Sequence, residues 1–138
     1  MGPRSGVTLL WVLSVAFVAV GLAFMVAPGT FADLATGESP RLASAVTDMR
    51  AVSGGVALGL GLFLGLCAAR DDWIAPGLLL SALVLACMPV SRVIGFIVDG
   101  GATGTQVALA VFETVAMVLC VLALRARSAD PAEGSVER

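Results

Sequence analysis

The 138-residue chain contains no histidine, no tyrosine and no lysine, so its eight basic residues are all arginines. Without histidine it cannot form a Ser–His or Cys–His nucleophile pair, an imidazole general base or an imidazole metal ligand. Its three cysteines contain no CxxC pair, and we therefore expect no metal site, no cofactor and no enzymatic activity. The absence of lysine and the formal charge of −2 also argue against nucleic acid as a partner.

Charged residues of both signs are scarce. They make up 13% of the chain, whereas apolar residues make up 59%. An average soluble domain is about 25% charged and roughly 45–50% apolar. This composition excludes an ordinary soluble protein, and the length allows only one compact unit. The sequence therefore predicts a small integral membrane protein whose first partner is the lipid bilayer.

Four long apolar runs cover residues 7–27, 46–69, 73–98 and 103–124. Each is close to the roughly 20 residues that a transmembrane helix needs. Tight connections between the later runs favour antiparallel neighbouring helices. The predicted fold is all-α, an integral membrane four-helix up-down bundle. It forms a single domain over residues 1–125, followed by a flexible polar cytoplasmic tail over residues 126–138.

The arginines predict the orientation. If the N-terminus is inside, the outer side holds Arg41, with Arg50 at the start of the second run. The inner side then holds Arg4, Arg70, Arg125, Arg127 and Arg138. Because positive charge concentrates on the cytoplasmic side, both termini are expected there. The first run is longer than the roughly 7–15 apolar residues of a signal peptide, so we interpret it as an uncleaved span. The lysine-free, alanine- and glycine-rich composition favours a bacterial cytoplasmic membrane.

Five glycines crowd the second run. They form two GxxxG pairs on different helix faces, together with one further glycine: Gly54, Gly55, Gly59, Gly61 and Gly65. Glycine costs about 1 kcal/mol relative to alanine in a soluble helix, but in membranes it lets helix backbones approach closely. We therefore expect the second run to be a central helix. The favoured interpretation is packing within the chain; the alternative is contact with other membrane protein subunits.

Three charged residues are expected at membrane depth or close to it. Arg92 precedes the turn between the third and fourth runs, and Glu113 follows it. At about 1.5 Å per residue, their depths differ by roughly 4–5 Å, which an arginine side chain can span. Arg50 enters the second run from the same side, and Asp99 and Gln106 lie closer to the turn. We expect one site to hold the three charged residues, with Asp99 and Asp48 near its mouth. Gln106 is a further candidate, because it shares a face of the fourth run with Glu113.

The role of this cluster stays open between alternatives. A charge at the bilayer centre costs about 2.5–3.5 kcal/mol on insertion scales, so Arg92 and Glu113 are expected to pair. The pair could be structural and fix helix register, or it could belong to a ligand, ion or proton site, or contact a partner subunit. Two arginines and one glutamate would suit an anionic group such as a carboxylate or a lipid phosphate. Pro89, one turn before Arg92, is expected to kink its helix and widen the space there.

At these positions the chain resembles a known family. The pattern includes Arg50-Ala51-x-x-Gly54-Gly55, then Arg92 and Gly95 before Asp99-Gly100, then Glu113, with Pro28, Phe31 and Leu34 after the first run. It is similar to the bacterial domain-of-unknown-function 4345 family, and more loosely to DoxX-like four-helix membrane proteins. The resemblance covers about residues 7–125. It implies a four-span membrane protein and adds no activity and no catalytic residues.

Two functions follow as hypotheses. The first is a non-catalytic accessory or binding subunit of a membrane assembly, with a buried Arg/Glu cluster in its outer half. The second is a membrane protein that binds a lipid or a small anion, with or without a link to transport, at Arg50, Arg92 and Glu113. A membrane enzyme is the poorest option, because no nucleophile–base pair or cofactor motif is present.

Overall fold

A computed structural model describes residues 3–128, which are helical apart from short connections and contain no strand. The element order is α1 (Pro3–Val26), α2 (Pro28–Thr36), α3 (Ala43–Met49), the π-helical η1 (Arg50–Val56), α4 (Ala57–Ala68), the 3₁₀ turn η2 (Asp71–Trp73), α5 (Ile74–Val98) and α6 (Gly104–Ser128). Four stretches are long and apolar enough to cross a membrane: Ser5–Val26, Ala43–Ala68, Asp71–Val98 and Gly104–Ser128.

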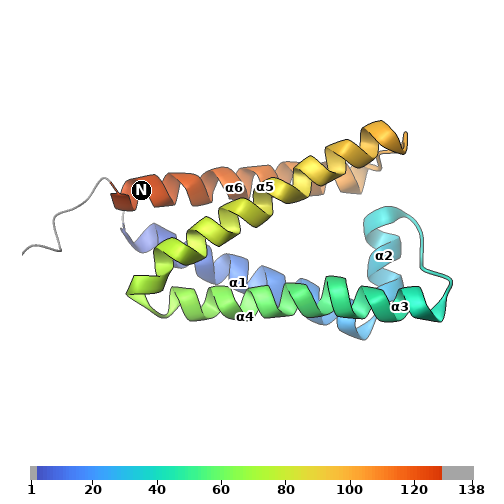
Figure 1. Cartoon of the computed structure of the whole chain (residues 1–138), viewed down its shortest axis with the longest axis horizontal. Helices are drawn as coiled ribbons and strands as arrows, with labels where there is room; N and C mark the ends of the chain where they lie inside the picture. The colour runs from blue at the N-terminus through green and yellow to red at the C-terminus, as the bar shows by residue number, and fades with distance from the viewer. Residues whose placement is uncertain (1–2, 129–138) are drawn as a thin grey trace, which may run out of the picture.

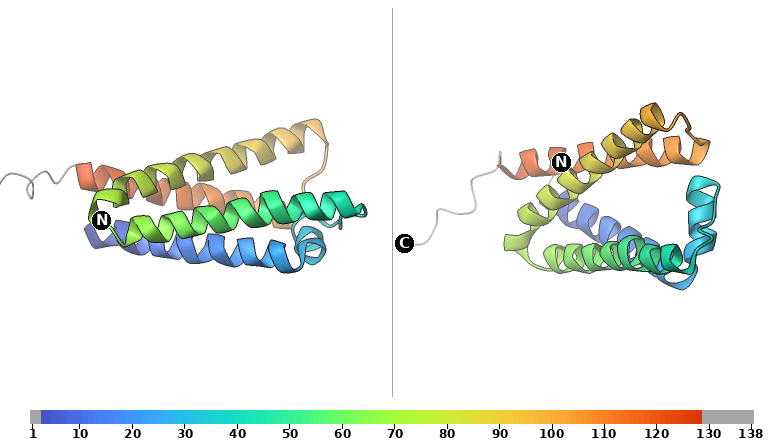
Figure 2. Two further views of the ribbon diagram at one scale, coloured as in Figure 1. Left: turned by 60° about the horizontal axis from the view of Figure 1, so that its bottom comes forward. Right: turned by 45° about the vertical axis from the view of Figure 1, so that its right-hand side comes forward.

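The long helices associate as two pairs. The segment from α3 through η1 to α4 runs as one continuous rod, and its η1 and α4 parts pack along α1. Helix α5 packs along α6, and contacts between the two pairs are fewer. Figure 1 shows the pairs meeting at the end where α4 turns into α5 and separating toward the opposite end. The start of α1 and the end of α6 lie at the meeting end, and both views of Figure 2 agree.

Buried side chains concentrate where the pairs meet, and we call this region the closed half. In α5 every buried residue lies between Ile74 and Leu85, within the first half of the helix. In α6 the buried residues begin only at Glu113. The fully buried centre of the closed half consists of Leu10, Leu64, Cys67, Ile74, Leu78 and Cys120. The hydrophobic core formed by residues 3–128 is therefore concentrated in one half of the helix arrangement.

Helix α2 stands across the separated end of the two pairs (Figure 1). Pro28 occupies its first turn, where the missing N–H of proline costs nothing. The helix ends at Gly37, whose φ of 84° lies in the left-handed region and whose N–H donates to the Asp33 carbonyl at 2.7 Å. The connection between the first two apolar runs thus contains a capped helix. Its contacts reach α1, α3 and α6.

The C-terminal boundary differs from the sequence expectation. Helix α6 continues through Ser128, so residues 126–128 are helical rather than part of a flexible tail. Alanine, leucine and arginine are strong helix formers, and Arg125 and Arg127 in the last turn favour the negative end of the helix dipole. The rest of the expected tail, residues 129–138, lies outside the described residues.

Candidate functional site

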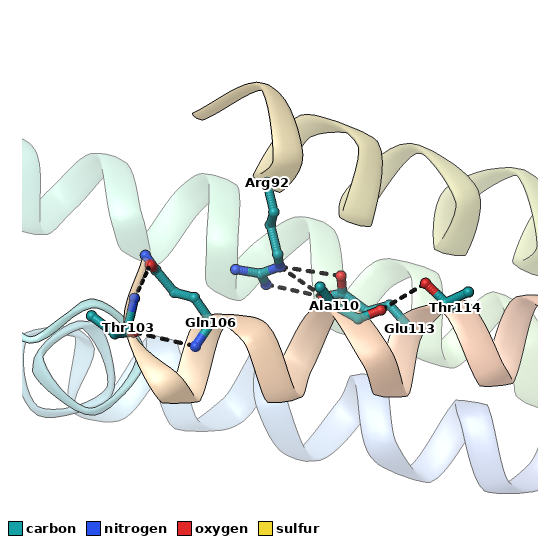
Figure 3. A network of polar contacts seen from close by, with 6 residues as sticks. All are labelled: Arg92, Thr103, Gln106, Ala110, Glu113 and Thr114. Atoms are coloured by element: carbon teal, nitrogen blue, oxygen red, sulfur yellow. Dashed lines mark hydrogen bonds and ion pairs between the residues drawn. The ribbon is translucent and has the colours of Figure 1, made fainter. Parts of the chain in front are cut away.

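The structure brings Arg92 of α5 and Glu113 of α6 together. The Arg92 Nη2 donates to Glu113 Oε1 at 3.0 Å, and the Nε donates to Oε2 at 3.1 Å and to Oε1 at 3.3 Å (Figure 3). The Glu113 side chain is only 6% exposed, whereas that of Arg92 is 26% exposed. Two parallel donors on one carboxylate give the strong bidentate form of this pair. The carboxylate is therefore closed in by its partner, and the guanidinium keeps an accessible edge.

A small hollow lies on the side of Arg92 that faces the turn between α5 and α6. Its volume is about 230 Å³, and Arg92, Asp99 and Gln106 are its polar lining residues. Gln106 also caps α6. Its Oε1 accepts from the Thr103 N–H, while the Thr103 Oγ1 accepts from the Gln106 N–H, both at 3.2 Å. This is the reciprocal capping box that fixes a helix start. The expected neighbour Asp99 and the candidate Gln106 thus lie beside the ion pair, and neither forms an ion pair or hydrogen bond with Arg92 among residues 3–128. Asp48, the other neighbour expected at the mouth, lies in α3 and lines neither the hollow nor the larger cavity described below.

Arg50 lies elsewhere, in contrast to the expected single site of three charges. Its Nε donates to the Met25 carbonyl at 3.1 Å, in the last turn of α1. The C-terminal carbonyls of a helix carry partial negative charge and attract a cation. Arg50 lies apart from the ion pair because of the face of the helix on which it stands. Arg50 shares its face with Gly54 and Gly61, and this face packs on α1 rather than on α5 and α6.

The glycines of the second run divide between two faces. A Cβ added at Gly61 would lie 2.7 Å from the Val18 backbone nitrogen, and one at Gly54 would lie 3.1 Å from the Met25 nitrogen. Ser14 strengthens the same contact, because its hydroxyl donates to the Gly61 carbonyl at 2.8 Å and lies against Gly65. Gly59 has open space where its Cβ would be, and Gly55 meets only the Arg50 carbonyl oxygen, at 3.8 Å. The Gly61/Gly65 pair therefore joins α4 to α1, and the Gly55/Gly59 pair is exposed.

A large apolar cavity separates the two helix pairs away from the closed half. It has a volume of about 590 Å³, within the roughly 300–1,000 Å³ of small-molecule sites. We call this region the open half. Its walls come from α1, α2, η1, α4, α5 and α6, and its bulkiest lining residues are Phe17, Phe24, Phe31, Leu60, Met88 and Phe112. Arg92 and Glu113 are the only charged residues in a lining that is otherwise mostly apolar. The ion pair is therefore part of the wall of a cavity that the residues around it do not fill.

The rim of the cavity is apolar and open. Leu34, Val56 and Phe112 line it and are 68%, 64% and 60% exposed. Val56 ends the π-helical segment η1, a rare geometry that often occurs at functional sites. Helix α5 passes through Pro89 without interruption, and the residues before it, Leu85 and Met88, line the cavity. Apolar molecules can reach the cavity without crossing a polar barrier at this rim.

Sequence reasoning did not anticipate the cavity or two hydroxyls in its wall, Ser53 and Thr105. A partial signal was present, because Phe31 and Leu34 are apolar residues in a polar connection and both turn out to line the cavity. The volume itself depends on how far the helix pairs separate, which no residue pattern expresses. The sequence therefore does not show that aromatic side chains from different helices line one cavity.

The chain matches no curated protein and no solved structure. The looser similarity to DoxX-like membrane proteins accordingly stays a prediction. A family profile does match, over residues 7–124, and its description is Domain of unknown function (DUF4345). This range includes every helix that lines the cavity and both residues of the ion pair. Because the match covers most of the chain, the protein belongs to the DUF4345 family.

Proposed function

We propose that this chain is a four-span, up-down helical membrane protein that binds an apolar small molecule bearing a polar group. The observation that carries the proposal is the apolar cavity of about 590 Å³ with a single ion pair in its wall. A buried charge pair is often no more stabilising than two apolar side chains of similar volume. Its place beside an unfilled cavity therefore supports a binding role. The proposal involves no catalytic step.

The membrane setting is part of the proposal. Large apolar side chains are exposed on all four long helices, among them Val15, Leu66, Leu83 and Val115. Such surfaces suit the hydrocarbon core of a bilayer. The helices can lie there because their backbone N–H and C=O groups are already hydrogen-bonded within each helix. The Arg70 guanidinium stacks over the Trp73 ring at 5.0 Å in the turn after α4, a pairing suited to a membrane surface. We place this turn and both termini on the cytoplasmic side of a bacterial cytoplasmic membrane.

The orientation has its own test. Single cysteines at Ser39 and at Arg70, in a background without the native cysteines, would be labelled by a membrane-impermeant maleimide in intact cells. We expect labelling at position 39 from outside, and at position 70 only after the membrane is opened. The opposite pattern would reverse the proposed orientation.

Binding can be tested by photolabelling of the full chain in liposomes. The probes are a C16 fatty acid with a diazirine on its chain and the methyl ester of the same acid. We expect at least one of them to label cavity residues such as Phe17 and Met88. Labelling there should saturate at probe concentrations that leave labelling of lipid-facing residues linear. Peptide mass spectrometry locates the labelled positions.

Two variants of α1 provide the matched control. Ala16 lines the cavity, whereas Ala19 on the same helix is exposed and is not among the lining residues. Ala16→Trp should fill the cavity and abolish saturable labelling, and Ala19→Trp should leave it unchanged. If neither probe labels the cavity, or if Ala16→Trp makes no difference, the binding function is wrong.

A second function is favoured by one specific observation. The exposed pair Gly55 and Gly59 offers a flat face where another helix could approach closely. An accessory subunit of a larger membrane assembly would use this face. Gly59→Leu should then reduce the size of the assembly extracted in mild detergent without changing the fold of the chain. An unchanged assembly would leave ligand binding as the function.

A further inference from the structure

Arg92 has one set of donors that the protein itself does not use. Its Nε and Nη2 bond to Glu113, whereas its Nη1 has no hydrogen-bond partner among residues 3–128. Figure 3 shows the third nitrogen directed away from Glu113, toward the Thr103 and Gln106 end of α6. Arg92 lines both the large cavity and the small hollow beside it. A molecule in the cavity can therefore reach a free N–H edge.

The charge balance at this edge is not positive. Glu113 neutralises Arg92, and Asp99 adds a second carboxylate to the lining of the small hollow. Arg50, which would have made the site cationic, is bonded to the end of α1 instead. An anionic head group would gain little net attraction here, and it would lose its hydration on entering an apolar cavity. The electrostatics therefore disfavour a carboxylate or a phosphate.

The two partners of the pair also differ in accessibility. The Glu113 side chain is 6% exposed, and both of its oxygens already accept from Arg92. The Arg92 side chain is 26% exposed and keeps donors free. At the ion pair itself, a ligand thus meets the free donors of Arg92 rather than the acceptors of Glu113, although the Asp99 carboxylate lies in the lining of the adjoining hollow. The complementary group is an uncharged acceptor, such as the carbonyl of an ester.

We infer that the occupant of the cavity is a long-chain molecule with an uncharged, hydrogen-bond-accepting head group, which the free edge of Arg92 recognises. This inference rests on the proposed binding function and specifies its ligand class. The chain would lie along the apolar walls formed by Phe17, Leu60 and Met88, and the head group would reach the small hollow. Glu113 then acts as a neutralising partner that holds the guanidinium in place and turns the specificity from anions toward neutral acceptors.

The test is competition against the photolabelling probe that labels the cavity. Three competitors share a similar chain: methyl oleate, oleate and the hydrocarbon 1-octadecene, each compared at equal concentration in the bilayer. We expect methyl oleate to compete about 5–10-fold better than the other two, the effect of roughly one net hydrogen bond. If oleate competes best, or if the three compete equally, the inference is wrong while the binding function stands. If no labelling saturates in the cavity at all, the binding function itself fails.

A double variant separates recognition from folding. Arg92→Met with Glu113→Met replaces the pair by apolar side chains and leaves no unpaired charge, so the chain is expected to fold. The variant should still bind 1-octadecene, and the advantage of methyl oleate over the hydrocarbon should fall to about 1-fold. An ester preference that survives in the double variant would place recognition at another group, such as Ser53 or Thr105, and would overturn the role of Arg92.

Discussion

The closed half and the open half are built from the same four long helices, yet they differ in how those helices are used. In the closed half, small residues such as Gly77 bring α5 against α4, and the side chains fill the interior. In the open half the same two pairs diverge, and bulky side chains line a cavity without filling it. Stability is therefore concentrated in one half, and the cavity of the proposed binding function lies in the other.

The largest expected effect comes from adding bulk where the two pairs meet. A Cβ at Gly77 would lie 2.7 Å from the Cys67 Cβ and 3.3 Å from Leu10 Cδ1. Gly77→Val should therefore destabilise the fold by about 3 kcal/mol or more, because overpacking a filled interior forces backbone shifts. The same substitution at Gly95, in the open half of α5, would meet only the Asp99 Oδ2 at 3.6 Å. Thermal unfolding in detergent should show a large loss for Gly77→Val and a small one for Gly95→Val. Equal losses would remove the distinction between the halves.

A deletion of side-chain volume probes the same contrast. Leu78 is fully buried in the closed half, whereas Leu109 lines the cavity. In lipid or detergent, the free energy of transferring apolar groups out of water no longer contributes to the loss of stability. The cavity that the missing side-chain atoms leave behind still does. Leu78→Ala should cost about 2–4 kcal/mol, and Leu109→Ala about 1 kcal/mol or less, since it only enlarges an existing space. Equilibrium unfolding in mixed micelles measures both. A Leu109→Ala variant as unstable as Leu78→Ala would show that the open half is packed.

The ion pair is the exception within the open half, where a single truncation should be costly. Glu113→Ala leaves Arg92 partly buried without a counter-charge, and we expect a loss of about 2–3 kcal/mol, near the lower end for buried pairs. Glu113→Gln keeps an acceptor and should lose somewhat less. The matched control is the double methionine variant, which should unfold within about 1 kcal/mol of the wild type. A single variant as stable as the wild type would mean that the pair contributes no structure.

The smallest effect is expected at the start of α6. Gln106→Ala removes one half of the capping box with Thr103 and should cost about 0.5–1 kcal/mol. Gln106→Glu keeps the acceptor and should restore the wild-type melting temperature. Because the capping box lies at the end of the open half that is farthest from the closed half, this loss should leave the closed half intact. Hydrogen exchange should rise around residues 103–107 and stay unchanged around Cys120.

The sequence predicts the helices well because their signal is local. Long apolar runs and the scarcity of charge suffice to indicate four helices. The approach of Arg92 to Glu113 also follows from counting the residues on each side of the turn, since a tight turn fixes the relative depth of residues in two adjacent helices. The position of Arg50 requires knowing which neighbour its face meets. The stripe it shares with Gly54 and Gly61 contained that information, because small residues mark the face packed on α1.

The cavity could not be predicted in the same way. Its volume reflects the angle between two helix pairs, and this angle results from contacts in the closed half, far along the helices from the space it creates. The π-helical turns of η1 add a further limit, because they change the angular offset between residues on either side.

The short connection between α5 and α6 has a consequence for biogenesis. In the membrane setting that we propose, each helix alone would carry one charge into the bilayer, at a cost of about 2.5–3.5 kcal/mol on insertion scales. Joined by residues 99–103, the two helices can leave the translocon together as a hairpin in which Arg92 and Glu113 are already bonded. The lipid then meets a neutral unit, and the polar group that distinguishes the finished cavity need never be exposed singly during assembly.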